Sequence, residues 1–114
     1  LTFLKVGIPN ILITNPRDIP GFVKELKRQP FAVMTGVNTL FNALMRNEAF
    51  RQLDFKPFRF TLGGGMAVQK AVALRWKEVT GVPLIEAYGL TEASPAVAIN
   101  PMDLKDYNGS IGLP

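Results

Sequence analysis

The 114-residue sequence contains neither cysteine nor histidine. Without cysteine there is no disulfide framework and no thiol nucleophile, and without histidine there is no imidazole base for a catalytic triad. Zinc sites built from these two residue types are excluded for the same reason. The absence of cysteine is compatible with the cytosol.

Long apolar runs are also missing. No run approaches the ~20 residues of a membrane-spanning helix, and no signal-peptide pattern opens the chain. Apolar residues make up 47% of the sequence and charged residues 19%, as in an ordinary globular domain. A chain of this length can bury a core without cross-links. Residues 1–114 are therefore expected to form one unit.

Negative charge is in the minority, because 13 Lys and Arg residues stand against 9 Asp and Glu residues, for a net charge of +4. Such an excess can indicate binding to nucleic acid or to an anionic membrane. Here Lys24, Lys27 and Arg28 share one polar helix face, and the other basic residues are scattered. This pattern favours a solvated surface, and no nucleic acid partner is expected.

Four short apolar segments predict strands, at residues 10–14, 31–35, 58–62 and 83–88. They are rich in β-branched, aromatic or aliphatic residues, and turn-forming residues bound them. From residue 89 onward, the Pro, Asn and Gly residues predict loops.

Three helices are predicted between these strands. The first begins at an Asp18 N-cap, the second at Asn38 or Thr39, and the third near Ala67, with Gly81 as its C-cap. The residues predicted to form the apolar faces of the second and third helices are Leu40, Phe41, Leu44 and Met45, and Val68, Ala71, Val72, Trp76 and Val79. We expect both faces to belong to the core.

The alternation of strands and helices predicts an α/β fold, with a mostly parallel sheet and right-handed crossover helices. In such sheets, ligands bind beyond the carboxyl ends of the strands. Residues 36–38, 63–66 and 89–92 follow three of the predicted strands. They should lie side by side if those strands are neighbours.

The triplet Gly63-Gly64-Gly65 lies between a predicted strand and a predicted helix. Glycines let the backbone approach a flat or anionic ligand closely, and a helix start offers free N–H groups. The triplet is equally compatible with a tight structural turn. It matches neither the Walker phosphate loop nor the dinucleotide-binding fingerprint.

The segment Tyr88-Gly89-Leu90-Thr91-Glu92 combines several suitable groups. The Tyr88 ring can lie against a planar base, and the Thr91 hydroxyl can bond to a phosphate oxygen. Glu92 offers a hard oxygen ligand suited to Mg²⁺. Taken one by one, these residues also fit a capped strand end with a solvated carboxylate.

This segment resembles the Tyr-Gly-x-Thr-Glu signature of the adenylate-forming superfamily, which includes acyl- and aryl-CoA synthetases, luciferases and peptide-synthetase adenylation domains. Residues 63–66 resemble that family's Gly-rich loop on the adenine side, and residues 109–114 resemble its Gly-Ser-x-Gly-x-Pro loop. The three motifs follow the family's order. Residues 12–18 and 36–44 are similar to bacterial long-chain fatty-acid–CoA ligases in particular.

The resemblance implies a role for each matching residue. The implied nucleotide-binding residues are Gly63, Gly64, Gly65, Glu86, Ala87, Tyr88, Gly89 and Thr91, and the implied acyl-site residues are Val37, Gly65 and Ala87. Thr91 would hold the α-phosphate and Glu92 would bind Mg²⁺, so these two are the implied catalytic residues. Many relatives carry glycine where this chain has Ala87, whose methyl group would narrow the floor of the pocket.

The implied reaction has two steps, with fatty acid, ATP and CoA as substrates. The carboxylate attacks the α-phosphorus of ATP to give acyl-adenylate and pyrophosphate, and the CoA thiol then displaces AMP. The protein positions the reactants and, with Mg²⁺, neutralises charge. The resemblance implies a cytoplasmic enzyme, with peripheral association at the inner face of a membrane as a variant.

We expect the chain to be an interior piece of such an enzyme. It starts at Leu1 without Met and stops at Pro114, and it lacks the family's phosphate loop, ribose-binding Asp segment and C-terminal domain with the catalytic lysine. The piece alone is therefore predicted to be inactive and to bind ATP weakly. Its exposed strand edges are expected to promote self-association.

Two alternatives stay open. In one, the parent enzyme adenylates a different carboxylate. In the other, the chain is a non-catalytic α/β binding module, in which the glycine triplet is only a turn.

Overall fold

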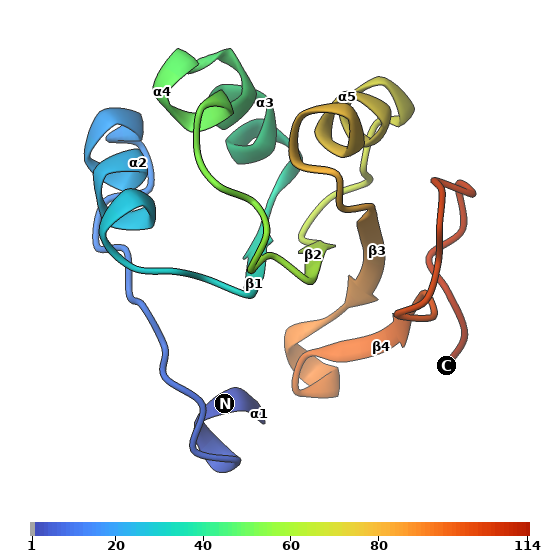
Figure 1. Ribbon diagram of the computed structural model, residues 1–114. Coiled ribbons are helices and arrows are strands. Elements are labelled where there is room, and N and C mark those ends of the chain that lie inside the picture. The colour runs from blue at the N-terminus through green and yellow to red at the C-terminus, as the bar shows by residue number, and fades with distance from the viewer. Residues whose placement is uncertain (1) are drawn as a thin grey trace.

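The computed structural model describes residues 2–114, and Figure 1 shows their arrangement. The helices are α1 (Thr2–Lys5), α2 (Ile19–Arg28), α3 (Asn38–Arg46), α4 (Glu48–Arg51) and α5 (Lys70–Thr80), together with the 3-10 helix η1 (Thr91–Ala93). The strands are β1 (Val33–Gly36), β2 (Phe60–Gly63), β3 (Leu84–Gly89) and β4 (Ala96–Ile99). Across the described residues, none of the helices has the length and apolar character needed to cross a membrane.

One four-stranded sheet runs through the molecule in the order β1-β2-β3-β4. Strands β1, β2 and β3 are parallel, and β4 pairs with β3 in the antiparallel direction. Figure 1 shows α2, α3, α4 and α5 on the same side of this sheet. The predicted α/β fold with a mostly parallel sheet and crossover helices is confirmed.

Helix α2 begins where the sequence predicts its start. The Asp18 carboxylate accepts a hydrogen bond from the Gly21 N–H at 3.1 Å, which satisfies one of the free amides of the first turn. Phe22, Val23 and Leu26 are buried on the inner face of the helix. These residues stand at positions i, i+1 and i+4, so one face of the helix lies in the core.

The predicted side-chain cap of α3 is wrong. Val37, whose side chain cannot accept a hydrogen bond, occupies the N-cap position, and Asn38 is the first helical residue. The buried Asn38 side chain accepts a hydrogen bond from the Gln69 N–H at 3.1 Å, at the start of α5. Asn38 thus joins two helices instead of capping its own, and Thr39 is exposed.

The core lies between the sheet and its covering helices. The predicted apolar face of α3 is part of it, because Phe41, Leu44 and Met45 are fully buried. Trp76 of α5 is also fully buried, and its Nε1–H donates to the Thr61 Oγ1 of β2 at 2.9 Å. This bond satisfies the indole N–H and ties the helix to the strand beneath it.

Helix α5 starts later than predicted, beyond Ala67. It ends as predicted at Gly81, which has the left-handed φ of 74° that glycine adopts without strain. Val72 faces the core as predicted, whereas Ala71 is exposed and Ala73 is buried instead. Ala73 lies three residues before Trp76 and shares its buried face, whereas Ala71 does not.

Two predictions about strands are wrong. Residues 10–14 form no strand, and Leu12 is 84% exposed. A strand requires ladder hydrogen bonds to a partner, and no described segment pairs with this one. Residues 96–99 were expected to be a loop but form β4, in which Ala98 pairs with Tyr88 and Ile99 pairs with Ala87. The other three predicted strands are present with shifted ends.

Candidate functional site

The carboxyl ends of β1, β2 and β3 meet at one edge of the sheet, which we call the carboxyl edge. Gly36 pairs with Gly63, and Gly63 pairs with Glu86. Just beyond β2, the Gly64 N–H donates to the Gly36 carbonyl at 3.1 Å. The segments that begin at Gly36, Gly63 and Gly89 therefore emerge side by side, as predicted.

A pocket of about 320 Å³ opens at the carboxyl edge. It is lined by Gly63, by residues 65–68 and 86–89, and by Ile111. A Cβ atom on Gly63 would lie 2.7 Å from the Val68 Cγ2, closer than side chains tolerate. Gly63 therefore packs directly against Val68, which lines the same pocket, and we call this pocket the edge pocket.

The glycine triplet also meets the loop before α3. Gly65 has a φ of 77°, and a Cβ atom placed on it would lie 3.2 Å from the Val37 Cγ1. A Cβ atom on Gly64 would lie 3.6 Å from the Ala87 carbonyl oxygen. Of the three residues predicted for an acyl site, Gly65 and Ala87 line the edge pocket, whereas Val37 lies next to Gly65 but does not line it.

Glu86 is the most unusual residue of the edge pocket. It is only 7% exposed, and among the described residues no hydrogen-bond partner reaches its Oε2 atom. Burial raises the pKa of the Glu86 carboxyl above its usual value, because the charged form loses solvation. Within the described part of the chain, the Glu86 carboxyl therefore keeps one buried oxygen atom unpartnered next to the pocket.

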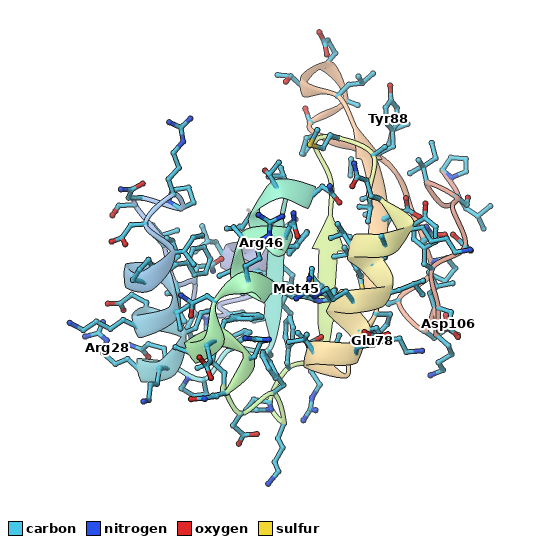
Figure 2. All side chains as sticks on the ribbon, turned by 90° about the horizontal axis from the view of Figure 1, so that it is seen from above. Arg28, Met45, Arg46, Glu78, Tyr88 and Asp106 are labelled. Carbon is cyan, nitrogen blue, oxygen red and sulfur yellow. The ribbon has the colours of Figure 1, made fainter. Side chains whose placement is uncertain are left out.

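Tyr88 and Gly89 end β3 at the mouth of the pocket. The Tyr88 side chain is 42% exposed, and Figure 2 shows it at the outer end of the sheet. A Cβ atom on Gly89 would collide with the Pro95 carbonyl, whose oxygen also accepts a hydrogen bond from the Leu90 N–H at 2.8 Å. Only glycine fits where this compact turn folds back against β3.

Thr91 and Glu92 lie in η1, within this turn, and both are exposed. They follow the edge pocket in the chain but are not among the residues that line it. Within residues 2–114, no group of three or more acidic side chains is placed to hold a metal ion. A cation held by Glu92 would therefore take most of its oxygen ligands from a bound molecule, which suits Mg²⁺ and a phosphate chain.

Comparison with known proteins shows which family this chain belongs to. The sequence model of the family described as "AMP-binding enzyme" matches residues 1–114. The chain belongs to the AMP-binding enzyme family. The carboxyl-edge glycines and residues 86–89 all fall within this AMP-binding match.

Several relatives of this AMP-binding chain are long-chain-fatty-acid–CoA ligases. Those of Yersinia pestis and Salmonella typhimurium are 63% and 59% identical to it over all 114 residues. The chain spans about 20% of the length of each. Among solved structures, the anthranilate CoA ligase AuaEII in complex with anthranoyl-AMP matches with a TM-score of 0.83 and 25% identity, over 95% of this chain and 21% of the other.

Two residues of the site escaped the sequence analysis. Ile111 lines the edge pocket, whereas the sequence assigns no role to it within the motif of residues 109–114. Asn100, predicted to lie in a loop, is 3% exposed and donates its backbone N–H to the Glu86 carbonyl at 3.1 Å. The sequence signal for Asn100 is a polar residue directly after the apolar segment 96–99. That signal indicates a structural role only if the segment is recognised as a strand.

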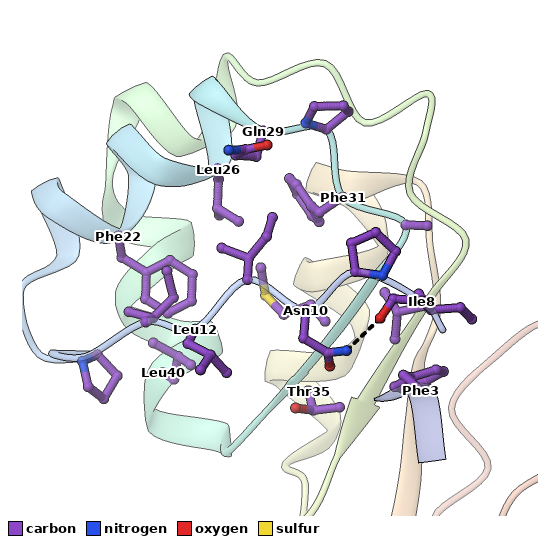
Figure 3. Close-up of a pocket in the computed structure, with 18 residues that line it drawn as sticks. Phe3, Ile8, Asn10, Leu12, Phe22, Leu26, Gln29, Phe31, Thr35 and Leu40 are labelled. Carbon is purple, nitrogen blue, oxygen red and sulfur yellow. Dashed lines mark hydrogen bonds between the residues drawn. The ribbon is translucent and has the colours of Figure 1, made fainter. Parts of the chain in front are cut away.

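A second cavity, of about 760 Å³, lies beneath α2 and is shown in Figure 3. Its walls come from residues 8–13, from Phe22 and Leu26 of α2, and from residues 29–35. None of the described residues that line it is charged. Its described walls therefore offer no charged side chain for acid–base chemistry, and the edge pocket remains the candidate site.

Proposed function

We propose that the chain is part of an ATP-dependent acid–thiol ligase that converts a long-chain fatty acid, ATP and CoA to acyl-CoA, AMP and pyrophosphate. The observation that carries the proposal is the edge pocket, in which the glycine triplet and residues 86–89 converge. The kinship with ligases of this name supports the choice of substrate.

In this proposal the edge pocket holds the adenine of ATP. The exposed face of Tyr88 borders the base, and the backbone of Gly63, Gly64 and Gly65 allows a flat ring to approach. The Glu86 carboxylate accepts a hydrogen bond from the exocyclic amine of adenine. This contact would satisfy the buried oxygen atom that is otherwise unpartnered.

Thr91 and Glu92 act on the phosphates. The Thr91 hydroxyl donates to the α-phosphate, and Glu92 supplies one oxygen ligand to Mg²⁺. When bound, Mg²⁺ reduces the repulsion between the attacking carboxylate and the triphosphate. Neither residue has to serve as nucleophile or base, so their contribution is positioning and charge neutralisation.

The acyl carboxylate lies beside Val37, Gly65 and Ala87, where the loop before α3 reaches the triplet. Its oxygen attacks the α-phosphorus while the bond to pyrophosphate breaks. The thiol of CoA, the second acceptor, then attacks the acyl carbon and releases AMP. We place this reaction in the cytoplasm or at the inner face of a membrane.

Pyrophosphate exchange tests the proposal. The full-length protein that contains this chain is incubated with ATP, labelled pyrophosphate and palmitate, acetate or benzoate. Palmitate should support the fastest exchange, and the isolated 114-residue chain should support none. Exchange with benzoate or acetate alone would redirect the proposal to another carboxylate, and no exchange with any acid would favour a non-catalytic module.

A further inference from the structure

We propose that Asn100 is a positioning residue for the edge pocket, holding the loop of residues 108–113 so that Ile111 forms one wall of the nucleotide site. The inference deepens the proposed function and rests on it, because it concerns the same pocket. Asn100 directly follows β4 and is 3% exposed. Its buried amide must therefore find partners within the protein.

The backbone of Asn100 is bonded to the pocket itself. Its N–H donates to the Glu86 carbonyl at 3.1 Å. Glu86 is one of the residues that line the edge pocket. Asn100 is thus attached to the strand that carries the adenine-contacting residues, and its side chain extends from a fixed point.

The side chain of Asn100 reaches the loop. Its Nδ2 donates to the Ser110 carbonyl, and its Oδ1 accepts from the Asn108 Nδ2 at 3.1 Å. Asn108 in turn accepts from the Ser110 N–H through its Oδ1 at 2.9 Å. These three residues form a closed network that fixes the loop immediately before Ile111.

The loop is fixed on the other side of Ile111 as well. Ile99 and Leu113 exchange two backbone hydrogen bonds, at 3.1 and 3.3 Å. Gly112 has a φ of 95°, and a Cβ atom there would collide with the backbone of Ile99 and Asn100. Ile111, which lines the pocket, is therefore held between two anchors.

Substitutions in the full-length ligase test this role, with AMP binding by calorimetry and the KM values for ATP and palmitate as measurements. Asn100→Ala should raise the AMP Kd and the ATP KM about tenfold, and the palmitate KM less than about twofold. Asn47→Ala is the matched control. Asn47 caps α4 by accepting from the Phe50 N–H at 3.1 Å, so this variant also loses a hydrogen bond, but the AMP Kd should not change.

Asn108→Ala provides a milder variant, because Asn108 is exposed and the bond between Asn100 and Ser110 remains. In the wild-type background, Asn108→Ala should raise the AMP Kd about threefold. In an Ile111→Ala background it should leave the AMP Kd unchanged, because both substitutions act through the pocket wall that Ile111 forms. An AMP Kd within about 1.5-fold of wild type in Asn108→Ala, or additive effects in the double variant, would overturn the proposal.

Asn108→Ala decides the question even if Asn100→Ala does not fold. The two proposals also fail in different ways. A protein that binds AMP but exchanges no pyrophosphate with any acid refutes the ligase function, while the AMP Kd still tests Asn100. An active ligase with unchanged AMP binding in Asn108→Ala refutes the positioning role alone.

Discussion

Replacing Glu86 by methionine should make the protein more stable and a poorer nucleotide binder. The folded state leaves Glu86 only 7% exposed, with one carboxyl oxygen unpartnered among the described residues. Leaving a buried polar group without a partner costs about 1–3 kcal/mol. Methionine has a similar length and no polar oxygen, so Glu86→Met should raise the free energy of unfolding by about 1 kcal/mol or more at pH 7.

The pH dependence of this gain follows from the raised pKa of the Glu86 carboxyl. Below about pH 4.3, the ordinary glutamate pKa, the group is protonated in both states and the ionisation penalty disappears. As the pH rises, the unfolded chain loses its proton first, so the wild-type protein loses stability relative to the variant until the raised pKa is passed. Urea unfolding at a series of pH values measures this difference.

Two further measurements sharpen the test. Glu78→Met, at an exposed position on α5, should change the free energy of unfolding by less than about 0.5 kcal/mol at any pH. Glu86→Met should weaken AMP binding about tenfold, because the adenine amine loses its acceptor. A destabilised Glu86→Met protein, or a stability gain independent of pH, would show that the carboxylate has a partner in the folded protein and refute the reasoning.

Three other substitutions probe the fold and the site. Gly63→Ala places a Cβ atom 2.7 Å from the Val68 Cγ2, so AMP affinity measured by calorimetry should fall about tenfold or more; unchanged affinity would place the base elsewhere. Glu92→Ala should slow adenylation about a hundredfold, with partial recovery in excess Mg²⁺, and an unchanged exchange rate would remove the metal-ligand assignment. Trp76→Phe leaves the buried Thr61 hydroxyl without its donor, and urea unfolding should show a loss of about 1–3 kcal/mol; no loss would mean that the hydroxyl finds another partner.

The sequence predicts the parallel part of the fold well because its signals are local. The Asp18 cap, the Gly81 cap and the buried apolar faces of α3 and α5 each follow from a few neighbouring residues. Strands are harder to predict from local sequence, because each strand forms only where a second strand supplies its ladder hydrogen bonds. Residues 10–14 have a strand-like composition without a described partner, whereas residues 96–99 gain their partner from the exposed side of β3.

The site was predictable to a similar extent. The glycine triplet and residues 86–89 meet as the topology of a parallel sheet requires. Asn38 and Asn100 were not foreseen as structural links, because a side-chain hydrogen bond to a distant backbone group leaves no local pattern. The roles of Thr91 and Glu92 remain predictions, since both lie outside the edge pocket.

The carboxyl edge is built from main chain more than from side chains, since Gly36 pairs with Gly63 and Gly64 bonds back to Gly36. In saturation mutagenesis, Gly63 should consequently reject even alanine, because an added Cβ atom would lie 2.7 Å from the Val68 Cγ2. Polarity and charge would matter only at neighbours such as Glu86. Homologues are therefore free to differ in the side chains around the carboxyl edge, while the main-chain path of the edge stays the same.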